Sequence, residues 1–456
     1  MRGSNKIYHK PYLPINRRRE LEKPFICRLS PSENGLEFEW FDKHCDGKHT
    51  LYYGLRNSDE KTAVEITDSI VKIDGLESMT DYEFYIEAEN GNRSYTRLFR
   101  PGPVPEGATV INYLHSEDNC YDFSGHFLCS PSLARTKSGR LIAGMDLFGG
   151  GMSQNLELLF YSDDDGKTWK YLTDLYPFYW ASLFVHKDVL YILGLTTEYG
   201  NLQISCSYDE GETWEVPVTL CYGSNRDCDY GGMHRAPMQV VNYNGRLYTT
   251  CEYGKWGDCC HLPMVASVDE NADLMKPENW SFTDLLYFEG EWKEKAEGVQ
   301  CDTIEGNVVM GPDGEMYNFM RWKLGYMLKL KIDKNNPEAP LEFVDIVEAP
   351  VTNSMFKIIP SGDKYYMVTN RKTEACAKYD VFRFRNVLSL VETKDFENFT
   401  VVKDIFNRED EDPLKNGFQY PAFLYENGEI LLSVRTAMNE PNNEHDSNYM
   451  LFIKVC

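Results

Sequence analysis

The chain has 456 residues, 42% of them hydrophobic and 14% aromatic, which is enough for two or three globular domains. Its formal net charge of −24 argues against a nucleic-acid binder, because such a protein needs a basic face for phosphates. No apolar run is long enough for a membrane-spanning helix. The 13 cysteines are odd in number and irregularly spaced, so we expect reduced, mostly buried thiols rather than a disulfide framework.

Residues 1–23 form a charged N-terminal extension with no apolar segment behind it. A secretory signal needs such a segment, so we expect a cytoplasmic protein. A secreted protein whose signal is missing from this sequence is the alternative.

Residues 24–100 predict a small antiparallel β-sandwich, because short alternating strands are separated by polar turns. The segment "VKIDGLESMTDYEFYIEAENGNRS" resembles a fibronectin type III domain, since Leu76, Thr80, Tyr82 and Ala88 match that family's residues. The resemblance implies a spacer or docking module, so we assign it no chemistry and expect any homo-oligomer to form through it. Residues 101–107, rich in Pro and Gly, predict a linker.

Residues 108–456 contain a repeat in which an apolar strand, a tight polar turn and a second apolar strand recur six times. The turns lie roughly 50 to 70 residues apart, and this all-β period is typical of propeller blades. We therefore predict a six-bladed β-propeller, closed by a strand at residues 108–115 that joins the last blade. The turn positions are Gly139, Asp188, Gly245, Gly314, Asp363 and Gly428.

Two segments, "YSDDDGKTW" and "SYDEGETW", share the pattern Ser-x-Asp-x-Gly-x-Thr-Trp, known as the Asp box. We expect its Ser and Asp to hydrogen-bond the backbone of a tight turn, and its Gly to adopt a conformation that other residues resist. A degenerate copy is "TKDFENF". These carboxylates are therefore interpreted as structural and not as catalytic.

Propeller geometry brings distant residues to one face, because each first strand runs down the central channel and each second strand runs back. The residues seven places after each turn are Asp146, Leu195, Glu252, Arg321, Asn370 and Arg435. The residues where the first strands begin are Cys129, Trp180, His234 with Arg235, Glu305, Asn353 and Tyr420. We expect these two sets to converge on one pocket.

The Asp boxes, the six blades and "TIEGNVVMGPDGEMYNFMR" resemble the sialidase (neuraminidase) superfamily. The resemblance implies that Tyr420 is a nucleophile, Glu305 its base, and Arg321 and Arg385 the anchors of a substrate carboxylate. A neutral Tyr suits a sugar whose anomeric carbon carries a carboxylate, since an anionic nucleophile would be repelled. Arg binds carboxylates bidentately.

Two departures from the family pattern concern the first blade. Cys129, in "LCSPSL", stands where the family has a third Arg. The family's acid–base Asp is also missing from the loop "MDLFGGGMSQN", where Asp146 lies a few residues early and is our candidate acid. Two Arg without the third suggest a uronic acid, or another acidic or neutral sugar, in place of ordinary sialic acid.

We therefore expect a retaining exo-glycosidase that acts on a terminal, acidic sugar of an oligosaccharide or glycoconjugate. The alternatives are a polysaccharide lyase that uses His234 and Tyr420 on a uronate, and a carbohydrate-binding propeller whose catalysis has decayed. No His-x-x-x-His or clustered-Cys pattern is present, so neither metal nor cofactor is expected. Further expected substrate-binding residues are Trp180, His234, Arg235, Glu252 and Arg435.

Overall fold

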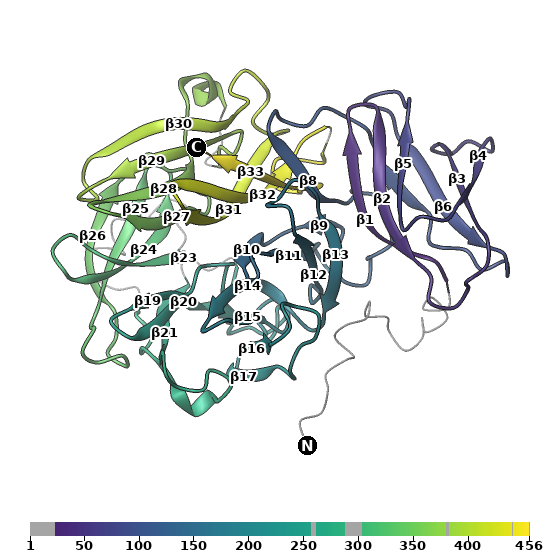
Figure 1. Cartoon of the computed structure of the whole chain (residues 1–456). Coiled ribbons are helices and arrows are strands. Elements are labelled where there is room, and N and C mark those ends of the chain that lie inside the picture. Colours follow the sequence, from purple (N-terminus) through teal and green to yellow (C-terminus); the bar gives the residue numbers. More distant parts are fainter. Residues whose placement is uncertain (1–22, 257–260, 288–302, 380–382, 440, 456) are drawn as a thin grey trace.

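The computed structural model describes residues 23–256, 261–287, 303–379, 383–439 and 441–455, which are almost entirely β-structure (Figure 1). Two sheets pack as an N-terminal sandwich, and six sheets radiate as blades around one axis. The predicted fold class, an all-β six-bladed propeller preceded by a small sandwich, is confirmed. Short 3-10 turns are η3 (Pro277–Asn279) and η4 (Glu374–Lys378). Within the described ranges no helix has the length and apolarity needed to cross a bilayer.

The sandwich consists of a three-stranded sheet, β1-β2-β5, and a four-stranded sheet, β4-β3-β6-β7. In β6 every second residue is buried, as expected for a strand with one face on the core. Phe84 of β6 meets Phe38 of the other sheet with ring centroids 4.9 Å apart. The strands are β1 (Phe25–Ser32), β2 (Gly35–Phe41), β3 (His49–Leu55), β4 (Thr62–Ile66), β5 (Ile70–Asp74), β6 (Tyr82–Ala88) and β7 (Arg97–Phe99).

Each of the first three blades is an antiparallel sheet whose strands follow one another along the chain. Blade one has β10 (Ser132–Arg135), β11 (Leu141–Phe148), β12 (Glu157–Ser162) and β13 (Lys170–Leu175), with β9 (Phe127–Leu128) beside β11. Blade two has β14 (Tyr179–His186), β15 (Val189–Leu195), β16 (Leu202–Ser207) and β17 (Val218–Cys221). Blade three has β18 (Gly232–His234), β19 (Val241–Tyr243), β20 (Arg246–Gly254), β21 (Leu262–Asp269) and β22 (Trp280–Phe282).

The remaining blades repeat this order. In blade four the two inner strands are buried along almost their whole length. Blade four has β23 (Ile304–Met310), β24 (Met316–Lys323), β25 (Tyr326–Ile332) and β26 (Glu342–Glu348). Blade five has β27 (Lys357–Ser361), β28 (Lys364–Asn370), β29 (Val387–Thr393) and β30 (Phe399–Asn407). Blade six has β31 (Gly417–Glu426), β32 (Glu429–Ala437), β33 (Tyr449–Val455) and β8 (Ala108–Tyr113).

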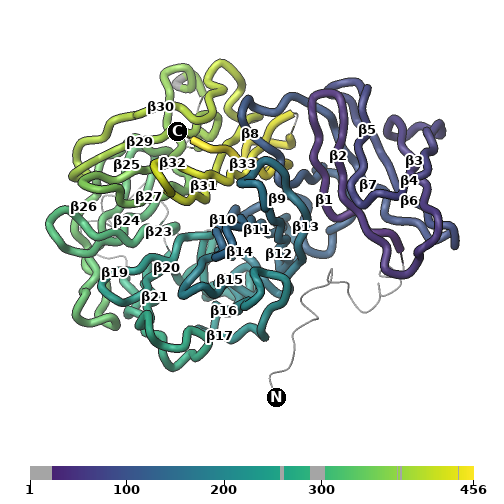
Figure 2. The backbone as a smooth tube through the Cα atoms, viewed as in Figure 1, coloured from purple at the N-terminus to yellow at the C-terminus, as the bar shows by residue number. Residues whose placement is uncertain are grey.

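The ring is closed by strands from the two ends of the propeller sequence. β8 pairs antiparallel with β33 as the outermost strand of blade six, as predicted for residues 108–115. Figure 2 shows the early chain, in blue, running beside the yellow C-terminal strands. Closure leaves blade six complete and brings it against blade one.

The sandwich is attached to the propeller through a shared core and buried polar contacts. One hydrophobic cluster contains both Phe84 of the sandwich and Leu432 of blade six. Arg97 Nε donates to Asp118 Oδ2 at 2.6 Å, and both side chains are at most 2% exposed. Arg28 Nε donates to the carbonyl of Ile111, in β8, at 2.9 Å. These contacts hold the sandwich to the strand that closes the ring.

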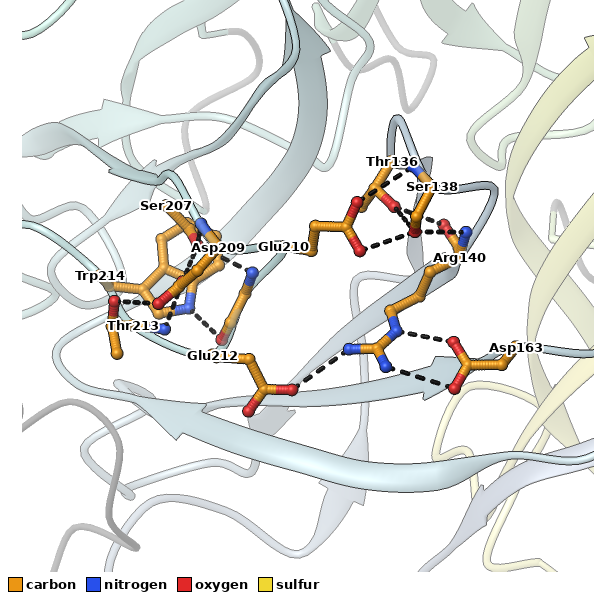
Figure 3. Close-up of polar contacts among 11 residues, drawn as sticks. Thr136, Ser138, Arg140, Asp163, Ser207, Asp209, Glu210, Glu212, Thr213 and Trp214 are labelled. Carbon is orange, nitrogen blue, oxygen red and sulfur yellow. Dashed lines mark hydrogen bonds and ion pairs between the residues drawn. The ribbon is translucent and has the colours of Figure 1, made fainter.

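The two Ser-x-Asp-x-Gly-x-Thr-Trp segments form the hydrogen-bonded turns that their pattern predicts. In the second copy Gly211 N donates to Ser207 Oγ at 2.8 Å and Thr213 N donates to Asp209 Oδ1 at 2.7 Å (Figure 3). In the first copy a Cβ on Gly166 would lie 2.0 Å from the Phe452 ring, so only glycine fits.

The second of these turns also connects two blades. Glu210 accepts a hydrogen bond from Ser138 Oγ at 2.7 Å, and Glu212 lies 3.2 Å from Arg140 (Figure 3). Ser138 and Arg140 belong to the first turn of blade one. The carboxylates of this segment therefore join the turns of adjacent blades, in agreement with their structural interpretation.

We predict that Arg97→Ala lowers the free energy of unfolding by about 3–5 kcal/mol, because it leaves the buried Asp118 carboxylate without its cation. Urea denaturation followed by tryptophan fluorescence measures this change. The matched control is Arg93→Ala, which removes the half-exposed pair with Glu87 and should cost less than about 1 kcal/mol. Equal effects of the two substitutions would contradict the proposed importance of the buried pair.

Candidate active site

A cavity of about 340 Å³ lies at the end of the axis where the first strands begin and the second strands end. Its walls include Trp180 and Tyr420, at the start of β14 and β31, and Arg321 and Arg435, toward the end of β24 and β32. Five Arg line it, although the whole chain carries a charge of −24. Its charged lining residues are Glu198, Arg226, Arg321, Arg383, Arg385 and Arg435. The cavity is therefore electropositive and suits an anionic ligand.

Tyr420 and Glu305 form a short hydrogen bond beside this cavity. Tyr420 Oη donates to Glu305 Oε1 at 2.5 Å, although the residues are 115 positions apart. Arg321 Nη1 lies 3.1 Å from both Glu305 oxygens and 3.4 Å from Tyr420 Oη. Arg321 Nε donates to Asn353 Oδ1 at 2.6 Å, which fixes the guanidinium plane. A phenol, a carboxylate and a guanidinium are thus assembled as one unit.

The protonation of Tyr420 follows from its surroundings. Burial, and then the Glu305 carboxylate, raise the pKa of Tyr420 to about 12, while the neighbouring Arg side chains oppose the shift. The phenol is therefore neutral at pH 7 and loses its proton only if an acceptor takes it during a reaction. In this structure the phenol donates its hydrogen bond to Glu305 Oε1.

Three residues at the start of inner strands adopt a left-handed backbone. Trp180, Glu305 and Tyr420 have φ of 48°, 61° and 54°. At each of these positions the pairing register shifts, which is the sign of a β-bulge. A positive φ on a non-glycine residue costs about 1–3 kcal/mol, and such strain clusters at functional sites. The repeated bulge re-aims these side chains, so that Trp180 and Tyr420 line the cavity and Glu305 reaches Tyr420.

Arg385 and Arg435 flank Tyr420 together with Arg321. Their guanidinium carbons lie 5.6 Å and 5.1 Å from the centre of the Tyr420 ring. Burial, and then the neighbouring Arg charges, lower the pKa of Arg385 to about 9, and one of its Nη atoms donates to Gln419. Arg321, Arg385 and Arg435 together carry more positive charge than the Glu305 carboxylate neutralises.

Arg435 occupies the place next to Cys129, where the first blade was expected to carry an Arg. Arg435 Nη1 lies 2.9 Å from Cys129 Sγ, and its other nitrogens donate to Ser447 Oγ and the His445 carbonyl. The short Cys side chain leaves room for a guanidinium that comes from blade six. A third Arg is therefore present, although a different blade supplies it.

Glu198 is the one carboxylate among the lining residues of this cavity in the described part of the chain. Glu198 Oε1 accepts from the Trp256 indole at 2.8 Å, and Oε2 accepts from Gln154 Nε2 at 2.7 Å. Arg226 Nε lies 3.4 Å from Oε2. Trp180 and Trp256 supply aromatic faces beside it, with ring centroids 6.3 Å apart.

Five of the expected site residues lie outside the lining of the cavity: Glu305, which is hydrogen-bonded to the lining residue Tyr420, and Asp146, His234, Arg235 and Glu252. Asp146 is fully buried, its carboxylate accepts the Trp180 backbone N–H, and burial raises its pKa to about 7. His234 Nδ1 lies 2.7 Å from Glu252 Oε2, and the imidazole packs against the Trp180 ring. Arg235 donates to backbone carbonyls, including that of Met238. These residues support the cavity wall from behind, whereas Trp180 lines it.

The sequence analysis did not select Glu198, Arg226, Arg383, His445 or Trp256. The position seven residues after the turn of blade two is Leu195, at the end of β15. Glu198 comes three residues later, in the following loop. A search for charged residues in the loops after second strands would have found it. Among the described residues, no group of three His, Cys, Asp or Glu is placed to hold a metal ion.

No protein-family model and no curated protein matches the sequence. Similar solved structures include the Hadza microbial sialidase Hz136, with 12% identity and a TM-score of 0.49 over 93% of each chain. The α-L-arabinofuranosidase ARB93A from Fusarium graminearum is 10% identical, with a TM-score of 0.49 over 76% of this chain and 97% of that chain. A protein of unknown function from Dyadobacter fermentans is 13% identical, with a TM-score of 0.50 over 77% and 99%. At such identities the likeness concerns the fold alone.

We predict that the Cys129 thiol is alkylated at least about tenfold more slowly than that of Cys228 in the folded protein. Burial raises the pKa of Cys129 to about 12, whereas a hydrogen bond from Ser224 lowers the pKa of Cys228. Timed iodoacetamide labelling with peptide mass spectrometry measures both rates. Similar rates in the native protein would show that Cys129 is not buried against Arg435.

Proposed function

We propose that this protein is a retaining exo-glycosidase that releases a terminal acidic sugar of the sialic-acid class. The observation that carries the proposal is the 2.5 Å hydrogen bond from Tyr420 to Glu305, beside three Arg. The volume of about 340 Å³ lies near the lower end of the range for small-ligand sites, which favours one terminal sugar over an extended chain.

The three guanidinium groups of Arg321, Arg385 and Arg435 bind the carboxylate of the sugar. Planar Arg forks match a carboxylate, and the partly buried cavity strengthens the attraction. A sugar with its carboxylate on the anomeric carbon repels a carboxylate nucleophile. A neutral phenol avoids this repulsion, and a pKa of about 12 keeps Tyr420 neutral until it reacts.

In the first step Tyr420 Oη attacks the anomeric carbon while Glu305 accepts the phenolic proton. The bond from the anomeric carbon to the aglycone oxygen breaks, and that oxygen takes a proton from an acid. The deprotonated acid then takes a proton from a water molecule as the water attacks the anomeric carbon. The bond from that carbon to Tyr420 Oη breaks, and the phenolate regains its proton from Glu305. Two displacements at one carbon retain its configuration.

Glu198 is the residue that we assign as general acid and base, in place of Asp146. Glu198 lines the cavity, whereas the Asp146 carboxylate is buried against the Trp180 backbone. The Trp256 indole and the Gln154 amide hold the Glu198 carboxylate in one orientation. An acid must reach the aglycone oxygen, so exposure to the cavity decides between the two residues.

The geometry gives less support to the two alternatives. Elimination by His234 requires the imidazole to reach the substrate, but His234 is 2% exposed and lies behind Trp180. A pure sugar-binding protein would need neither a strained Tyr420 nor its hydrogen bond to Glu305. Hydrolysis is the reaction that uses both features.

We predict that Tyr420→Phe lowers kcat by roughly 10³-fold or more, because it removes the nucleophilic oxygen. Release of methylumbelliferone from the 4-methylumbelliferyl glycosides of sialic and glucuronic acid measures turnover. Tyr425→Phe, in the same strand and 37% exposed, is the matched control and should retain activity. Full turnover by the Tyr420 variant, or no turnover by the wild type despite sugar binding, would refute the proposal.

We predict that Glu198→Gln lowers kcat/KM about 10²- to 10⁴-fold for glycosides with an alkyl alcohol as leaving group. The loss should be much smaller with 4-nitrophenol, which departs without a proton. Asp146→Asn is the discriminating control, because it removes the alternative acid and should show no dependence on the leaving group. The reverse pattern would assign the acid role to Asp146.

A further inference from the structure

A second cavity, of about 400 Å³, lies in the propeller channel toward the opposite end of the first strands. Its walls come from the whole of β10, from later positions of β14 and β31, and from residues of β19 and β27. A small apolar cluster of Ala236, Met238 and Met355 packs against Tyr420. Tyr420 lines the first cavity, and Met238 directly precedes Gln239, which lines the second, so the cluster lies between the two.

Lys357, the first residue of β27, lines this second cavity and is only 5% exposed. Within the described residues, its ammonium group has no hydrogen bond and no ion pair with a carboxylate. Arg235 is the charged neighbour that acts on it, and Arg235 is itself a buried cation bonded to carbonyls. Burial, and then Arg235, lower the pKa of Lys357 to about 7. Lys357 and Arg235 are thus two buried cations that act on each other, and Glu252, the carboxylate that acts on Arg235, does not pair with Lys357.

Other polar groups of the cavity also have hydrogens to donate. Ser132 Oγ accepts the Leu183 N–H at 2.5 Å, and Ser182 Oγ accepts from Arg235 Nη2 at 2.8 Å. Because each hydroxyl acts as an acceptor in these bonds, its own hydrogen remains available for a ligand.

The carboxylate that lines this cavity in the described structure does not balance Lys357. It belongs to Glu426, whose Oε2 accepts from Arg135 Nε at 2.6 Å. Arg135 therefore neutralises Glu426, and the charge of Lys357 remains unpaired. Lys357, Ser132 and Ser182 give the cavity a surplus of donors over acceptors.

We propose that this second cavity is a binding site for a small inorganic anion, held by the Lys357 ammonium and the hydroxyls of Ser132 and Ser182. Halide and phosphate share the required chemistry, since each accepts several hydrogen bonds and carries negative charge. The bound anion stabilises the propeller by pairing with a cation that burial would otherwise neutralise. It does not take part in the glycosidase reaction, because the apolar cluster separates it from Tyr420.

The first test is thermal unfolding in sodium chloride, bromide or phosphate, with sodium gluconate as the bulky reference anion at equal ionic strength. We expect the small anions to raise the wild-type melting temperature saturably, by about 1–3 °C. Lys357→Met should lose the rise. Lys364→Met, which removes a partly buried lysine of β28 paired with Glu392, should keep it. A rise that persists in Lys357→Met overturns the proposal, because it would come from the Arg-lined cavity or the surface.

The same measurement repeated with pH gives an independent readout. Lys357 is protonated below pH 7, so the anion-dependent rise should be largest there and should fade as the pH increases toward 9. The charged groups around it are Arg235, Arg135 and Glu426. Burial lowers the pKa of Arg235 only to about 10, and the pKa of Arg135 is raised because its hydrogen bonds to Asp165 and Glu426 outweigh burial. A rise that does not change between pH 6 and 9 would contradict the role of Lys357.

Wild-type crystals soaked in sodium bromide provide a test that needs no variant. Diffraction at the bromine absorption edge should show an anomalous peak within hydrogen-bond distance of Lys357 Nζ. The absence of a peak at Lys357 overturns the proposal even if the glycosidase assignment holds.

Discussion

The pairing of β8 with β33 is the constraint on which the rest of the structure depends. It joins the two ends of the propeller sequence in one sheet and places blade six beside blade one. Without it, Arg435 of blade six would not reach Cys129 of blade one, at 2.9 Å. The sandwich contributes to the same constraint, because Arg28 and Asp118 connect it to β8 and to the segment that follows.

Closure has an electrostatic consequence at one end of the axis. Five Arg from several blades line one cavity in a chain of net charge −24, and burial together with the neighbouring Arg charges lowers the pKa of Arg385. Mutual repulsion and burial both cost free energy. The left-handed backbone of Trp180, Glu305 and Tyr420 adds strain at the same place. A fold tolerates such a concentration of unfavourable features where a ligand compensates them, which agrees with binding of an acidic sugar.

The axis contains two electropositive regions with different local chemistry. The Arg-lined cavity combines its cations with a phenol, a carboxylate and aromatic walls, which suits a reactive sugar. The second cavity has the unpaired ammonium of Lys357 and the hydroxyls of Ser132 and Ser182. Its described lining residues include no nucleophile next to an acid or base. The apolar cluster of Ala236, Met238 and Met355 keeps the two regions apart.

The sequence by itself determined the six blades, the turn positions and the residues that open and end the inner strands. This was enough to bring Tyr420, Glu305 and Arg321 to one site, because strand periodicity and turn chemistry are local and visible in the chain. Arg385 was selected only through the resemblance to sialidases. Tertiary structure alone decided the direction of each side chain. Asp146 turns away because its carboxylate accepts the Trp180 N–H, while Arg435 fills the place beside Cys129. Such outcomes depend on hydrogen bonds between blades, which no pattern within a single blade encodes.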